Sequence, residues 1–237
     1  MKYAISLFLI INTLTSCSHN YYDKNLESKY LSSNATIDKL NFENKEVLFL
    51  SITHFGTKTY YDNVKFKIDS LQKNGFKVFY EGQEYIRYSN EIPDNEIIFY
   101  KKFRKITGID ILIPYTSIKP YSEYAKKYNL IDQPNYKELN VKKEQSENVD
   151  IKIKDLIQFY ENNFNQIVLD NCDLSTNLKE TYKCQTLDEN SKKLFRDNII
   201  QNLRNENLLN KIILDNNSKL LIIYGKNHLN YLKNITK

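Results

Sequence analysis

Three ionisable side chains each follow a run of residues that is typical of a buried strand. His54 follows VLFLSIT, Glu81 follows FKVFY, and His228 lies just beyond LLIIYGKN. Two imidazoles and a carboxylate can form a ligand set for a divalent transition metal. The same groups can instead act as acid and base around a substrate. The spacing is not that of a local metal motif such as H-E-x-x-H, so a purely structural role for each side chain stays open.

The runs before these side chains are the elements that must position them. Residues 47–53 and 219–224 are almost continuously apolar, a pattern typical of strands buried on both faces. Residues 60–73 show helical spacing and 76–80 form another short apolar run, so strand, helix and strand make a βαβ unit with parallel strands. Ligands bind outside the carboxyl ends of such strands, where the three side chains are expected to meet.

The remaining pattern predicts one α/β domain. The chain has 237 residues, 41% of them hydrophobic, which is enough for the core of a single domain. Helical spacing recurs at 94–106, 151–164 and 187–214. We therefore expect a central mixed or mainly parallel sheet flanked by helices over 45–237, with a largely helical insertion at about 93–185.

Four stretches resemble the TraB/GumN/Tiki family, part of a wider group that includes erythromycin esterases and ChaN-like haem-binding lipoproteins. They are LFLSITHFGT, VFYE, FRDNIIQNL and LLIIYGKNHL, in that order along the chain. The family has two G-x-x-H motifs that each close a strand. It also has a glutamate at the end of the second strand and an arginine, often followed by an acid, that opens a late helix.

The family pattern can be carried over residue by residue. The second G-x-x-H is intact as GKNH, which ends at His228, and the glutamate corresponds to Glu81. The helix arginine and its acid correspond to Arg196-Asp197. The first motif keeps His54 but has Ser51 where the family has glycine, and serine resists some backbone conformations that glycine allows. The middle third of the chain shows no matching motif.

The resemblance implies a metal-dependent, peptidase-like hydrolase. His54, Glu81 and His228 would hold or flank a divalent metal such as Mn²⁺, Co²⁺ or Zn²⁺ that activates water. Glu81 would be catalytic. Arg196 would stabilise the developing oxyanion or bind a substrate carboxylate. The substrate class, peptide or small molecule, stays open.

Two other functions remain open from the sequence. One is a non-catalytic lipoprotein that binds haem or another iron ligand, by analogy with the ChaN-like relatives. The other is an inactive family member, because Ser51 alters the first motif. Nucleic-acid binding is not expected, since the 34 basic residues are scattered among 29 acidic ones without a basic stripe.

The first residues indicate export and lipid anchoring. A lysine precedes a mostly apolar stretch at 3–13, which is too short for a permanent membrane helix. LTSC then resembles a bacterial lipobox, with Cys17 as the lipidated residue. We expect a signal peptide at 1–16 and a polar tether at 17–44. Acyl chains on Cys17 would attach the protein to a membrane of the bacterial cell envelope, facing outside the cytoplasm.

The other two cysteines lie in a polar, turn-rich segment. Cys172 and Cys184 are twelve residues apart, and no neighbouring histidine or third cysteine completes a metal site. Outside the reducing cytoplasm such a pair favours a disulfide, with two free thiols as the alternative.

Overall fold

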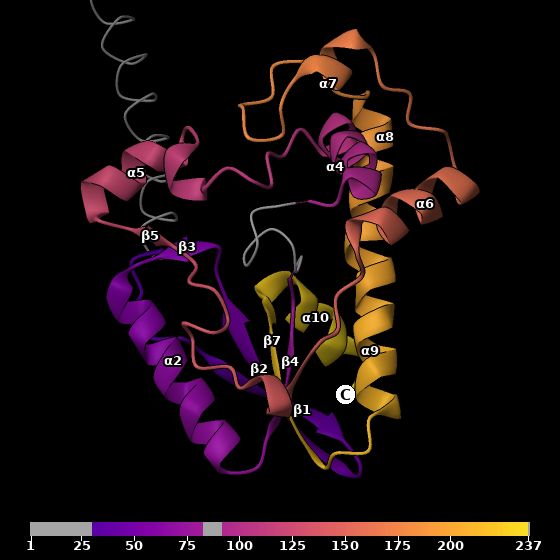
Figure 1. Ribbon diagram of the computed structural model, residues 1–237. Coiled ribbons are helices and arrows are strands. Elements are labelled where there is room, and N and C mark those ends of the chain that lie inside the picture. Colours follow the sequence, from indigo (N-terminus) through magenta and orange to yellow (C-terminus); the bar gives the residue numbers. More distant parts are fainter. Residues whose placement is uncertain (1–29, 83–91, 237) are drawn as a thin grey trace, which may run out of the picture.

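The computed structural model of the chain describes residues 30–82 and 92–236 (Figure 1). The expected signal peptide at 1–16 and the expected lipidation site Cys17 lie outside these residues. Among the helices of the described ranges, none has the length and apolar character needed to cross a membrane.

Five strands form the central sheet, in the order β1-β2-β7-β4-β6. β1 pairs antiparallel with β2, and all other neighbours are parallel. This confirms the predicted α/β fold with a mainly parallel sheet. The strands are β1 (Ile37–Phe42), β2 (Lys45–Ile52), β4 (Lys77–Tyr80), β6 (Ser146–Asn148) and β7 (Lys219–Gly225), and a small second sheet pairs β3 (Phe55–Gly56) with β5 (Ile131–Asp132).

Helices cover both faces of the sheet and also lie above its upper edge. In Figure 1, α2 covers one face, α9 and α10 cover the other, and α4, α6, α7 and α8 gather above the strands. The bounds are α2 (Lys58–Lys73), α4 (Asp94–Thr107), η1 (Tyr115–Ser117), α5 (Tyr121–Tyr128), η2 (Lys143–Gln145), α6 (Ile153–Asn163), α7 (Asn171–Ser175), α8 (Glu189–Leu194), η3 (Phe195–Leu203), α9 (Arg204–Leu214) and α10 (Lys226–Ile235).

The continuous apolar run of β7 reflects burial on both faces. Ile223 packs in the cluster that contains Ile68 of α2, whereas the neighbouring Ile222 packs in the cluster that contains Leu208 of α9. Successive side chains of a strand point to opposite faces, so a strand covered on both sides needs an apolar residue at every position. β7 is paired on both edges, by β2 and β4, and is the central parallel strand.

Two strands of the central sheet lie where the sequence predicted none. The expected tether at 17–44 includes β1, which lines up antiparallel with β2 and buries Leu40. The expected insertion at 93–185 is not one helical excursion, because β6 lies inside it and pairs with β4. Ser146-Glu147-Asn148 carries no apolar residue, so neither strand periodicity nor β propensity could reveal it.

A second hydrophobic core lies within the helical group. It brings together side chains from α4, α6 and η3, including Phe103, Ile157 and Phe195. Phe195 contacts both Phe103 and Tyr160 edge to face, with ring centroids 5.8 and 5.5 Å apart. This core joins the helices that cover the site described below.

The long segment predicted as a helix or a pair at 187–214 forms one continuous rod. It runs as α8, η3 and α9 from the upper helical group down along the sheet (Figure 1). Its middle section, η3, is a nine-residue π-helix. π-Helical segments are rare and occur frequently at functional sites.

The loop after α7 is held to the helical group by a disulfide and by several hydrogen bonds. Cys172 and Cys184 form a disulfide with a Cα–Cα distance of 5.8 Å. The buried guanidinium of Arg104 in α4 donates hydrogen bonds to the carbonyl oxygens of Thr176 and Asn177, at 3.1 and 2.9 Å.

Removing this disulfide should destabilise the protein. A disulfide that closes a loop of this length lowers the conformational entropy of the unfolded chain, which raises the free energy of unfolding by about 3 kcal/mol. We expect Cys172→Ala/Cys184→Ala to lose about that much free energy of unfolding, measured by urea denaturation under oxidising conditions. An unchanged midpoint would show that the hydrogen bonds of the loop, among them those from Arg104 and from the Tyr182 N–H to Asp110, hold it without the disulfide.

Candidate functional site

The four parallel strands deliver polar groups to one cavity of about 380 Å³. Glu81 directly follows β4, and Gly225 is the last residue of β7. His54 and Asp150 lie two residues after β2 and β6. The carboxyl ends of parallel strands share one edge of the sheet, so residues distant in sequence meet there. The convergence of His54 and Glu81 expected from the sequence is therefore present.

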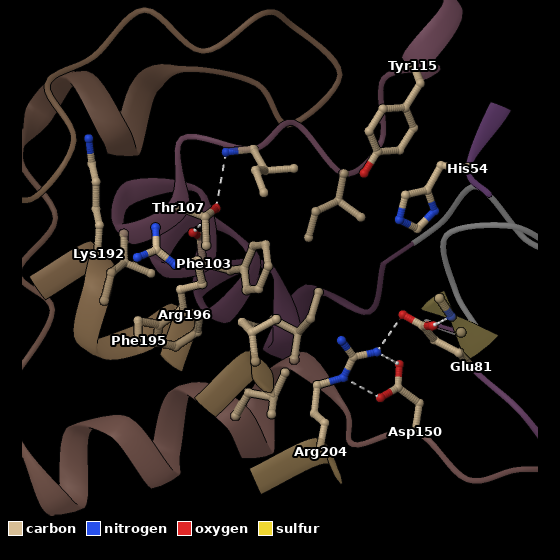
Figure 2. A pocket seen from close by; sticks show the side chains of 18 of the residues that line it. His54, Glu81, Phe103, Thr107, Tyr115, Asp150, Lys192, Phe195, Arg196 and Arg204 are labelled. Carbon is tan, nitrogen blue, oxygen red and sulfur yellow. Dashed lines mark hydrogen bonds and ion pairs between the residues drawn. The ribbon is translucent and has the colours of Figure 1, made fainter. Parts of the chain in front are cut away.

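A buried ion network forms the floor of the cavity (Figure 2). The Nη2 of Arg204 donates to Glu81 Oε1 at 2.7 Å and to Asp150 Oδ2 at 2.8 Å, and its Nε donates to Asp150 Oδ1 at 2.7 Å. The side chains of Glu81, Arg204 and Asp150 are 19%, 11% and 3% exposed. The second oxygen of Glu81, Oε2, accepts from the backbone N–H of Gly225 at 2.9 Å.

This network keeps Glu81 ionised. Burial by itself would raise the pKa of this carboxyl group, but Arg204, the two histidines His228 and His54, and the Gly225 N–H outweigh it and lower the pKa to about 2. Burial by itself would lower the pKa of Arg204. The carboxylates of Asp150 and Glu81 raise it by more, so the pKa lies well above its usual value. Glu81 is therefore a fixed negative charge at neutral pH and a weak proton acceptor.

Arg204, not Arg196, is the arginine that reaches Glu81. Arg196 is on the same rod eight residues earlier, which corresponds to about 12 Å along a helix axis. Its side chain is 62% exposed and pairs with Asp197 at 3.1 Å. It lines the same cavity at the opposite end from Glu81, as Figure 2 shows. The expectation that Arg196 binds an oxyanion or a substrate carboxylate stays a prediction, while the contact with Glu81 is made by Arg204, two helical turns further on.

His54 lies on the wall above Glu81. Its ring stacks on Tyr115 with the centroids 4.9 Å apart and the planes 2° from parallel. The backbone carbonyl of His54 accepts a hydrogen bond from the N–H of Gln133 at 2.8 Å, which fixes the residue after the end of β2. Figure 2 shows the imidazole nitrogens of His54 and the hydroxyl group of Tyr115 directed into the cavity.

His228 lies behind the cavity and does not line it. It is 4% exposed, in the first turn of α10, and its Nδ1 is 2.6 Å from Oδ1 of Asn205. Because that amide oxygen can only accept, Nδ1 carries a proton. Burial is the largest influence on the pKa of His228 and lowers it, with Arg204 adding to the effect and Glu81 opposing it. His228 is thus a neutral, positioning residue.

The burial of neutral His228 predicts a pH-dependent stability. Its folded-state pKa is below the ordinary value of 6.5, so the unfolded chain binds the proton more readily and stability falls as the pH drops below about 6.5. We expect urea unfolding to show lower stability at pH 5 than at pH 7. His228→Gln should flatten this slope, and His19→Gln, which changes a histidine of the expected tether, should keep it. An equal slope in His228→Gln would contradict the assignment.

The residues do not fit the expected metal centre. Within residues 30–82 and 92–236, no three His, Cys, Asp or Glu side chains are grouped as a ligand set. Glu81 uses one oxygen for Arg204 and the other for the Gly225 N–H, and His228 lies behind the wall. The ion pairs compete with a cation for the same oxygens. We therefore derive no step through Mn²⁺, Co²⁺ or Zn²⁺.

The remainder of the cavity is mostly apolar. Its wall comes from α4, the loop after α4, α6 and η3, that is, from the helical group above the sheet. The apolar side chains are Phe103, Ile106, Ile109, Ile111, Ile153, Leu156, Phe195 and Ile200. The cavity thus joins a charged floor at the sheet edge to a hydrophobic wall, a combination typical of small-molecule sites.

The backbone of Ser51 is unstrained, although its buried hydroxyl oxygen has no hydrogen-bond partner among the described residues. Ser51 lies inside β2 and is paired with Tyr224 of β7. Its φ is not positive, since the non-glycine residues with positive φ among the described residues are Asn129 and Asn140. Its carbonyl accepts a hydrogen bond from the hydroxyl of Tyr60 at 3.0 Å. The departure from G-x-x-H therefore leaves the strand that positions His54 intact.

Sequence reasoning missed three residues of this cavity: Asp150, Tyr115 and Arg204. Asp150 follows the polar strand β6, which gives no sequence signal. Tyr115 is one of nineteen tyrosines, so its type alone is uninformative. Arg204 lies eight residues after Arg196 on the same predicted helix, and nothing local in the sequence distinguishes the two arginines.

No protein-family model matches the chain, and neither a curated protein nor a solved structure matches it. The resemblance to the TraB/GumN/Tiki family stays a prediction from the motifs. The functional argument therefore depends on the geometry of the cavity.

Proposed function

We propose that this chain is a lipid-anchored hydrolase of the bacterial cell envelope, with an acid–base centre formed by His54, Glu81 and Arg204. The observation that carries the proposal is the placement of all three in one cavity, with Glu81 buried and ionised. The lipobox-like LTSC that ends at Cys17 supports the cellular setting, and the TraB/GumN-like motifs support a hydrolase. The substrate would be an ester or amide of a small molecule or peptide.

His54 is the group best suited to move a proton. The ordinary pKa of imidazole lies near neutral pH, whereas Glu81 is too acidic to act as an effective base. His54 would take a proton from water as the water oxygen attacks the carbonyl carbon, and would then return that proton to the leaving group as the carbon–heteroatom bond breaks. The fixed charge of Glu81 stabilises the imidazolium that forms in between.

Arg204 can stabilise the oxyanion of the tetrahedral intermediate. Its Nε and Nη2 are used by Asp150 and Glu81. Its third nitrogen, Nη1, makes no hydrogen bond or ion pair with the described residues, and Figure 2 shows it on the cavity side of the guanidinium. A donor held rigidly by two carboxylates needs little reorganisation during the reaction.

The test is hydrolysis of a panel of 4-nitrophenyl esters and fluorogenic peptides by the full chain. We expect His54→Gln to lower kcat by about 10²–10⁴-fold, because it removes the general base. His19→Gln is the matched control and should keep full activity. EDTA should leave the rate unchanged, since no step above uses a metal.

Three outcomes would contradict this mechanism. Full activity in His54→Gln removes the proposed base. Loss of activity in EDTA, restored by Mn²⁺, Co²⁺ or Zn²⁺, favours the metal-dependent alternative. The absence of hydrolysis across the panel favours a ligand-binding protein. A ligand-binding role is also compatible with Glu81, because both of its oxygens already have partners.

A further inference from the structure

Besides Glu189 and Phe195, the rod α8–η3–α9 presents to the cavity four residues that are spaced at intervals of four. They are Lys192, Arg196, Ile200 and Arg204, and all of them line it. In an α-helix, residues four apart drift by about 40° around the axis at each step, so four such residues would not share one face. The π-helix η3 has more residues in each turn, so residues four apart within it fall short of a full turn. They therefore shift around the axis in the opposite direction. The π segment thus aligns the whole row along the cavity.

The row places positive charge at both ends of an apolar stretch. Arg204 is at the sheet end, and Ile200 lies between it and Arg196. Lys192 and Arg196 are at the far end, beyond Phe103 as seen from Glu81 in Figure 2, and Phe195 lies beside Arg196. The cavity therefore has a charged floor, a hydrophobic middle and a basic outer end.

The two ends differ in net charge. At the floor, the carboxylates of Glu81 and Asp150 outnumber the single guanidinium of Arg204, so a permanently anionic head group is less favourable there than at the outer end. The Nη1 of Arg204 can still donate to an oxyanion that forms only during the reaction. At the outer end, Lys192, Arg196 and Glu189 line the cavity, so two cationic groups face one carboxylate there. The side chains of Glu189, the partner of Lys192, and of Asp197, the partner of Arg196, are 87% and 47% exposed. Exposed ion pairs of this kind are weak.

The guanidinium of Arg196 has unused donors. Its Nε pairs with Asp197 at 3.1 Å, and no other partner of this side chain is recorded within the described ranges. The two terminal amino groups are therefore available to a ligand. A planar guanidinium suits bidentate binding of carboxylate or phosphate oxygens.

We infer that the cavity binds an amphipathic anion. The carboxylate or phosphate head would lie at Lys192 and Arg196, and the apolar chain would lie along Phe103, Phe195 and Ile200. The group to be cleaved would reach His54 and Glu81, a point that rests on the proposed function. The binding mode itself rests only on the placement of charge and apolar surface.

The test is calorimetric titration of the full chain, held in lipid nanodiscs with protein-free discs subtracted. The probes are octanoate, octyl phosphate and 1-octanol, which share a chain length and differ in the head. We expect the better of the two anions to bind about tenfold more tightly than the alcohol, the scale of a charge-assisted hydrogen bond. The comparison of octanoate with octyl phosphate identifies the head group.

Two variants locate the anion. Lys192→Gln/Arg196→Gln should reduce the preference over 1-octanol to about twofold or less, with binding of the alcohol unchanged. Lys183→Gln/Lys193→Gln removes the same net charge from exposed positions that do not line the cavity, and it should keep the preference. Circular dichroism should show both variants folded, because all four side chains lie at or near the surface.

Either of two results would overturn the inference. One is equal binding of the anions and the alcohol by the unmodified protein. The other is an anion preference that survives Lys192→Gln/Arg196→Gln. None of the probes contains a cleavable acyl bond, and binding is measured at equilibrium, so the test does not depend on hydrolysis. Anion binding without hydrolysis of the ester panel would therefore reject the proposed function and leave this inference standing.

Discussion

Replacing Arg204 by methionine should lower the free energy of unfolding by about 3–5 kcal/mol, the largest stability loss expected for any single site of the cavity. Methionine keeps most of the side-chain volume but removes the positive charge. Glu81 and Asp150, whose side chains are 19% and 3% exposed, would then face each other without a counter-charge. An uncompensated buried charge is strongly destabilising, whereas replacing a whole buried network is often tolerated.

Urea denaturation at pH 7 measures this effect, and two variants make it specific. Arg196→Met removes an arginine from the same rod, but that side chain is 62% exposed and the loss should stay within about 0.5 kcal/mol. Adding Glu81→Gln and Asp150→Asn to Arg204→Met should recover a large part of the stability, because no buried charge remains. If the triple variant is as unstable as Arg204→Met, the loss arises from packing and the account of the network is wrong.

Changing Glu81 to glutamine should abolish most of the proposed hydrolysis. The amide keeps the size of the side chain but removes the charge that stabilises the imidazolium of His54, so kcat should fall by about 10²–10⁴-fold. Glu147→Gln is the matched control, because this glutamate lies on β6 beside β4 and its side chain is 38% exposed. Activity of Glu81→Gln close to that of the unmodified protein would exclude an electrostatic role.

Glu81 also predicts the acid stability of the fold. Its pKa is near 2 in the folded protein and near 4.5 when exposed, so the carboxylate stabilises the folded state above pH 4.5. This contribution, on the order of 3 kcal/mol, is lost as the pH falls from 4.5 towards 2. Urea unfolding between pH 5 and pH 2.5 should show this loss in the unmodified protein. Glu81→Gln should lack this part of the pH dependence, and a parallel loss in the variant would contradict the assignment.

The sequence alone predicted the elements that create the sheet edge. β2, β4 and β7 are short apolar runs, and α2 shows a helical period, because burial on one or two faces leaves a local pattern in the chain. Since β-α-β order implies parallel strands, the positions of His54 and Glu81 directly after two strands were enough to expect them together. β1 and β6 were missed, since an edge strand needs few apolar residues to pair.

The identity of the charged partners was decided only by the tertiary structure. Arg204 and Glu81 are separated by 123 residues, and nothing local distinguishes Arg204 from Arg196, which lies on the same rod. Which arginine reaches the carboxylate depends on how far the rod extends over the sheet and on the rotation set by its π-helical section. His228 likewise follows a strand as predicted, but the first turn of α10 directs it towards Asn205, behind the cavity. Hydrophobic periodicity is a local property of the chain, whereas an ion pair requires atoms of distant segments to meet within about 3 Å, and only the packed fold determines that distance.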